Sequence, residues 1–154
     1  MTNYRVNDVD SNTFARFPVT IVTKAIEFDS TSWSTPVILA QSDTDGVFGY
    51  SIVSLYATNT DTVGNNLIFY IQYESNTPIS TPVSFCPVAA GAGTDFLQAA
   101  VPVIESDTMS HLSRVDNNGN SYIPMDLKWK LLVKLRTALS SGKKIAVVST
   151  CNYY

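Results

Sequence analysis

The single histidine of this 154-residue chain, His111, is the first residue to consider for catalysis. Ser110 and Ser113 lie next to it in the sequence, and a histidine that takes a proton from a serine is the basis of nucleophilic catalysis. The chain holds 17 Ser and 16 Thr, so such neighbours arise by chance in any polar stretch. We therefore expect His111 to be an ordinary loop histidine.

Carboxylates give no clearer sign of an active site. The only glutamates, Glu27, Glu74 and Glu105, each fall at the end of a strand-like run, where a solvated carboxylate is the simplest interpretation and a glycosidase pair is not indicated. Residues 43–46 (DTDG) resemble the first half of a calcium loop, but the later acidic ligands are missing. A polar turn explains them better.

The two cysteines, Cys86 and Cys151, lack CxxC spacing and histidine neighbours. Structural zinc requires four nitrogen or sulfur ligands, which two Cys and one His cannot supply. We expect two unpaired thiols on strands, with a disulfide as the alternative, and no metal or other cofactor. The chain is predicted not to be an enzyme; a hydrolase built on a jelly-roll fold is the remaining enzymatic hypothesis.

Aromatic side chains offer a different chemistry, because sugars stack on exposed rings. Trp33, in the loop 29–35, is the best candidate, and Tyr50, Tyr56 and Tyr70 lie at outward positions of strand-like runs. Packing within a core is the competing interpretation of all four.

The segments that must position these residues are predicted to be strands. Val, Ile and Thr number 42, whereas only 15% of residues are charged, which favours β-structure. Apolar runs separated by turn residues predict strands, which we place at Pro18–Phe28, Pro36–Ala40, Phe48–Thr58, Leu67–Glu74, Thr81–Val88 (an edge strand, because of its prolines), Tyr122–Pro124 and Lys144–Thr150. Ala89–Thr94 and Asp116–Asn120 are predicted to be an exposed loop and a tight turn.

Asp126–Arg136 shows the clearest periodicity. Apolar and basic residues alternate strictly, with Leu127, Trp129, Leu131, Val133 and Leu135 at one parity and Lys128, Lys130, Lys134 and Arg136 at the other. This pattern predicts one half-buried strand with Trp129, Leu131 and Val133 in the core. A leucine-rich helix is the alternative.

These features predict an all-β fold, a single β-sandwich of jelly-roll or Greek-key type with about eight strands over residues 17–154. Residues 1–16 are polar and are predicted to form an extended arm, with Tyr4, Val6, Val9 and Phe14 spaced as anchors for an interface.

Surplus apolar residues point to association with other chains. In 50–58, Val53, Leu55 and Ala57 occupy one parity, while Tyr50, Ile52 and Tyr56 occupy the other, so both faces of this strand are apolar. A two-layer sandwich cannot bury both faces of many strands, which indicates either an oligomer or a surface covered by a different chain. We expect a homo-oligomer, and specifically a trimer.

Charge and hydropathy argue against two classes of partner, nucleic acids and membranes. Residues 1–110 hold 11 acids and three bases, whereas 111–154 hold two acids and seven bases, for a net charge of −3. A solvated strand face or contact with acidic proteins explains the basic end, and nucleic acid is not expected. No apolar run reaches the length of a membrane span.

Two stretches, PVILAQSDTDGVFGYSIVSLYATNTDTVGNNLIFYI (36–71) and NGNSYIPMDLKWKLLVKLRTALSSGKKIAVVSTCNYY (118–154), resemble small structural proteins of tailed bacteriophages, the capsid decoration or cement proteins. That resemblance implies a β-sandwich, often a trimer, with an arm draped over its neighbours. It implies no catalytic residues.

The resemblance therefore predicts a non-enzymatic virion protein, made in the host bacterial cytoplasm, that binds the major capsid protein on the capsid surface and bridges its subunits. The alternative is a phage head or tail fibre module that binds host-surface carbohydrate.

Overall fold

Ten strands and one short 3-10 helix make up the secondary structure in the computed structural model, which describes residues 20–41, 49–74, 81–94 and 99–154. The helix, η1, spans Asp107–Met109. The strands are β1 (Thr20–Phe28), β2 (Val37–Gln41), β3 (Gly49–Asn59), β4 (Asn65–Tyr73), β5 (Ser84–Val88), β6 (Val101–Pro102), β7 (Arg114–Val115), β8 (Ser121–Asp126), β9 (Trp129–Leu135) and β10 (Ile145–Tyr153).

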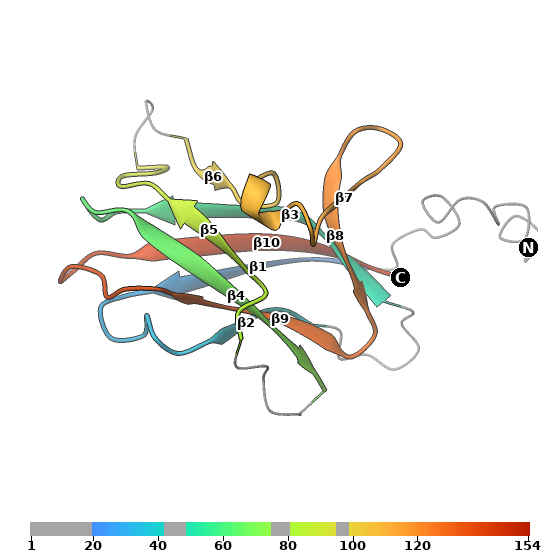
Figure 1. Ribbon diagram of the computed structural model, residues 1–154, viewed down its shortest axis with the longest axis horizontal. Helices are drawn as coiled ribbons and strands as arrows, with labels where there is room; N and C mark the ends of the chain where they lie inside the picture. Colours follow the sequence, from blue (N-terminus) through green and yellow to red (C-terminus); the bar gives the residue numbers. More distant parts are fainter. Residues whose placement is uncertain (1–19, 42–48, 75–80, 95–98) are drawn as a thin grey trace, which may run out of the picture.

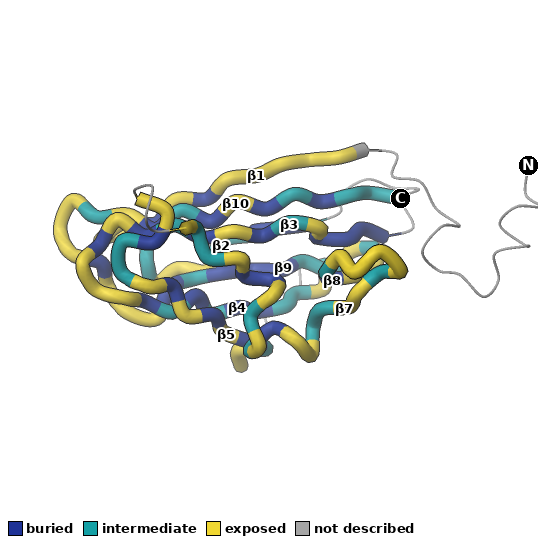
Figure 2. Tube along the Cα trace, turned by 90° about the horizontal axis from the view of Figure 1, so that it is seen from above, coloured by how far each residue is buried: buried dark blue, intermediate teal, exposed yellow. Residues whose placement is uncertain are grey.

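The strands form two antiparallel sheets that pack face to face (Figures 1 and 2). The larger has the order β1-β10-β3-β8-β7, with β6 also paired to β3, and the smaller has the order β2-β9-β4-β5. When the eight strands of five or more residues are renumbered along the chain, the sheets read 1-8-3-6 and 2-7-4-5, which is jelly-roll order. The predicted all-β sandwich is confirmed.

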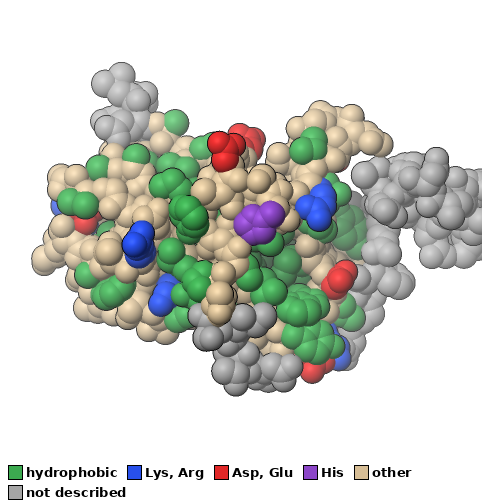
Figure 3. All heavy atoms as spheres, viewed as in Figure 1, with side chains coloured by type: hydrophobic (Ala, Val, Ile, Leu, Met, Phe, Trp, Pro, Cys, Tyr) green, Lys and Arg blue, Asp and Glu red, His purple; other side chains and the backbone are tan. Residues whose placement is uncertain are grey.

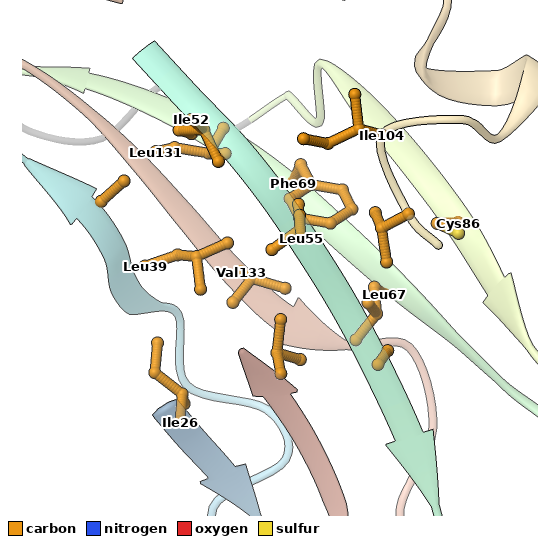
Figure 4. Close-up of a cluster of buried hydrophobic side chains, with 14 of the residues drawn as sticks. Ile26, Leu39, Ile52, Leu55, Leu67, Phe69, Cys86, Ile104, Leu131 and Val133 are labelled. Atoms are coloured by element: carbon orange, nitrogen blue, oxygen red, sulfur yellow. The ribbon is translucent and has the colours of Figure 1, made fainter. Parts of the chain in front are cut away.

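Side chains from both sheets fill the space between them (Figure 4). Ile52 and Leu55 of β3 meet Leu67 and Phe69 of β4 there, and all four are at most 1% exposed. This burial is the main source of stability in a chain without a described disulfide.

Strand β3 corrects one sequence-based inference. Ser54 pairs with Thr150 and Ile52 pairs with Cys151, so Val53 is an extra residue that forms a β-bulge. The bulge switches the alternation, and therefore Ile52 and Leu55 both point into the core while Val53 is 36% exposed. Much of the apolar surplus predicted for this strand is buried within the chain itself.

The prediction of one strand over Asp126–Arg136 was wrong at its start. β8 ends at Asp126 in one sheet and β9 begins at Trp129 in the other, with a turn between them in which Lys128 has φ 72°. Leu131 and Val133 lie in the core as predicted, but Trp129 is only half-buried and packs against Tyr73, with ring centroids 5.3 Å apart.

The turns largely follow their sequence signals. The Asp116 carboxylate accepts the backbone N–H groups of Asn118 and Asn120, both at 2.8 Å, and closes the predicted tight turn. The loop Ala89–Thr94 is also confirmed, but Ala92 within it is buried, and its carbonyl accepts the Asn59 N–H at 2.8 Å. The predicted edge strand is β5, at one end of the smaller sheet.

Candidate functional site

A groove with a volume of about 560 Å³ crosses the outer face of the smaller sheet. Its floor follows the strand register, because Phe85 of β5 pairs with Ile68 of β4, which in turn pairs with Lys134 of β9. We call it the cationic groove and define it by its lining residues, Asn66, Ile68, Tyr70, Pro82, Val83, Ser84, Phe85, Thr108, His111, Lys134 and Arg136. Figure 3 views this face of the molecule.

One wall of the groove is the segment that contains η1, which is tied to the edge of β5. Thr108 Oγ1 donates to the Phe85 carbonyl, and Ser84 Oγ donates to the Thr108 carbonyl at 2.5 Å. The His111 ring nitrogen Nε2 lies 2.7 Å from the Val83 carbonyl, and since a carbonyl only accepts, Nε2 carries the proton. Carbonyl groups at this edge are therefore occupied by side chains of the same chain.

The floor offers one accessible aromatic ring. Phe85 is 48% exposed, whereas Tyr70 is only 8% exposed. The Lys134 ammonium lies 5.6 Å from the centre of the Tyr70 ring, a cation–π distance, and so covers that ring rather than leaving it open for stacking. A ligand on this face would meet Phe85 and Ile68 as its apolar contacts.

The charge of the groove has one sign. Among its described lining residues, Lys134 and Arg136 are basic and none is a carboxylate. Among the described residues, the two ion pairs are Lys128–Glu74 and Lys144–Glu27, and neither includes a groove residue. The groove is therefore a cationic site in a chain whose net charge is −3.

The predicted aromatic platform does not exist as a unit. Trp33 packs against the core, and Tyr50 is 2% exposed, stacks on Tyr153 and donates a hydrogen bond to the Trp129 carbonyl at 2.8 Å. Tyr56 lies on the outer face of the larger sheet, 46% exposed. Only Tyr70 borders the groove.

The residues considered for catalysis are also apart or otherwise engaged. The bonded nitrogen of His111 faces a backbone carbonyl and not a serine hydroxyl. Glu27 and Glu74 pair with lysines at the surface. Cys86 and Cys151 are free, buried thiols on different sheets. Across the described residues, no group of three or more His, Cys, Asp or Glu is placed to hold a metal ion.

Several predicted site residues lie outside the described residues. These are the arm anchors Tyr4, Val6, Val9 and Phe14, together with the calcium-like turn 43–46. Within the described ranges no helix has the length and apolar character to cross a membrane.

Sequence reasoning missed Phe85, Lys134 and Arg136 as parts of one site. The usable signal was the spacing of Lys134 and Arg136, two basic residues at one parity of a strand-like run. Comparisons of the chain with protein-family models, curated proteins and solved structures gave no match.

Proposed function

We propose that this chain is a non-enzymatic virion structural protein that decorates a bacteriophage capsid and stabilises it by bridging capsid subunits. Jelly rolls occur in viral capsid and lectin domains, so the fold is compatible with this role but does not specify it. The resemblance of residues 36–71 and 118–154 to decoration proteins supports the assignment.

The observation that carries the proposal is an apolar row on the outer face of the larger sheet. Strand register aligns Ala25, Val148, Tyr56 and Pro102 across β1, β10, β3 and β6. All four are exposed, Val148 by 38% and Tyr56 by 46%. We call these four residues the outer apolar row. Exposed apolar residues grouped in this way are typical of a surface that another protein covers.

The edge of the same sheet supports a capsid subunit as the partner. Among the described strands, β1 pairs with β10 alone, and Ile21 is 64% exposed. Lys24 of β1 donates to the Ile38 carbonyl of β2 at 2.6 Å and so links this edge to the smaller sheet.

Addition of purified variants to shells that lack the protein tests the proposal. Tyr56→Lys and Val148→Lys each place a charge in the row and should lower occupancy and shell stability, and deletion of residues 2–14 should do the same. Val63→Lys is the matched control, because Val63 is 63% exposed outside the row. If both row variants occupied the shells as fully as the wild-type protein does, the outer apolar row would not be the contact surface.

Self-association is a separate part of the proposal. The bulge at Val53 removes most of the argument made from β3, but Ile21 and Val22 of β1 remain 64% and 42% exposed. Sedimentation should show a species three times the 16.8 kDa of one chain. A stable single chain at micromolar concentration would remove the homotrimer from the account.

A second candidate function is an adhesion module of a phage head or tail fibre that binds carbohydrate. The cationic groove is the observation that favours it, because an exposed ring lies beside hydrogen-bonding and cationic side chains. The two functions use opposite faces of the sandwich and can be tested independently.

A further inference from the structure

We propose that the cationic groove binds a saccharide that carries carboxylate groups, such as a chain of uronic acids. This inference rests on the second candidate function and names its ligand class. The volume of about 560 Å³ lies within the range of about 300–1,000 Å³ typical of small-ligand sites.

The positive charge of the groove favours an anionic ligand. Lys134 lies on β9 and Arg136 directly follows its last residue; both line the groove, and none of its described lining residues is a carboxylate that could neutralise them. The Arg136 guanidinium can hold a carboxylate through two parallel hydrogen bonds. An unneutralised pair of cations within an acidic protein is complementary to a negative ligand.

The hydrogen bonding along the edge of β5 favours a sugar over a peptide. An extended peptide is commonly captured by adding a strand to a sheet edge, where its backbone pairs with free carbonyl and N–H groups. Here the Val83 and Phe85 carbonyls already accept hydrogen bonds from His111 and Thr108. At these two positions the carbonyls are already engaged, so we assign recognition there to side chains.

Those side chains match the two surfaces of a sugar ring. The exposed face of Phe85 and the neighbouring Ile68 can cover its C–H groups. The planar amide of Asn66 and the guanidinium of Arg136 can bond its hydroxyl and carboxylate oxygens. Asn66 and Arg136 are adjacent across β4 and the end of β9, since the Arg136 N–H donates to the Asn66 carbonyl at 3.0 Å.

Titration calorimetry of the full chain with trigalacturonic acid tests the proposal. We expect saturable binding with a Kd below about 1 mM that weakens as salt is raised. The fully methyl-esterified trisaccharide is the matched ligand control, because it keeps the sugar rings and lacks the charges. It should bind at least about tenfold more weakly, the loss expected when a charge-assisted hydrogen bond is removed.

Three variants locate the site. Arg136→Gln and Phe85→Ser should each weaken trigalacturonate binding about tenfold. Lys130→Gln should leave it unchanged, because Lys130 lies on the same strand and face as Lys134 but outside the groove. Matching melting temperatures would show that the variants fold.

Three outcomes would overturn the proposal. The first is the absence of saturable binding, and the second is an equal loss in Lys130→Gln and Arg136→Gln, which would indicate general charge attraction. The third is binding of triglutamate in place of the saccharide, which would identify an acidic peptide as the ligand. Because no shell is present, each failure leaves the capsid proposal standing, and a failure of shell attachment leaves this one standing.

Discussion

The bulge in β3 gives a prediction that separates the observed strand from a regular one. In regular alternation Val53 and Leu55 would share a face, and Ile52 would point the other way. The structure instead buries Ile52 and Leu55 and leaves Val53 36% exposed. Substitution of each by alanine therefore tests which residues face the core.

The expected magnitudes follow from burial. Ile52→Ala and Leu55→Ala each remove a side chain that is at most 1% exposed, and each should lower the free energy of unfolding by about 2–5 kcal/mol. Val53→Ala should cost under about 1 kcal/mol, as is usual for exposed positions. In a domain of this size, 1 kcal/mol shifts Tm by about 2–4 °C.

Urea unfolding followed by circular dichroism measures these differences, and an unchanged m value would show that the cooperative unit is intact. A second comparison uses deletions. Removing Val53 should restore a regular strand with the same residues inward, whereas removing Tyr56 should turn one half of β3 away from the core. The reasoning would be refuted if Val53→Ala cost as much as Leu55→Ala, or if the Val53 deletion were the less stable of the two deletions.

Three further predictions concern stability and reactivity. Burial raises the pKa of both thiols, that of Cys151 to about 11, so native protein at pH 8 should react slowly with a thiol reagent and rapidly once unfolded; fast native reaction would contradict this. Hydrogen bonds led by the Ser140 N–H lower the pKa of Asp61, so this carboxylate stabilises the fold above its ordinary pKa near 4 and loses that effect as pH falls through the lowered value. Asp61→Asn should therefore lower Tm at pH 7 and progressively less below pH 4, and a pH-independent difference would show that charge is not involved. Trp129→Ala should cost less than Leu131→Ala in urea unfolding, because Trp129 is half-buried, and the reverse order would place Trp129 in the core.

Local patterns predicted most of the strands, and their failures have physical causes. Alternation identified Leu131 and Val133 as core residues, but it continued through Leu127 and so concealed the turn between the two sheets. That turn needs Lys128 at positive φ, a conformation that lysine rarely adopts and that composition does not signal. The bulge at Val53 was hidden for a related reason, since one extra residue changes parity without changing the apolar character of the run.

The groove could not be predicted from the sequence because its residues come from strands that are far apart in the chain. Lys134 and Arg136 are two residues apart at the end of β9, but Phe85, about fifty residues before them, reaches them only through β4. Sequence reasoning noted the basic C-terminal third of the chain but assigned it to a solvated strand face or to contact with acidic proteins. Of the aromatic residues considered for sugar binding, Tyr56 does lie on an outer face, but Tyr50 is packed between the sheets because the bulge at Val53 changes the parity of the strand.

Hydrogen–deuterium exchange of the chain free and bound to capsid shells tests the central claim most directly. The account predicts saturable binding to shells that lack the protein, with slower exchange in β1 and around Tyr56, and no change along the cationic groove. Failure of the folded chain to bind, or protection confined to β4 and β5, would contradict the proposal that it bridges capsid subunits through β1 and the outer apolar row.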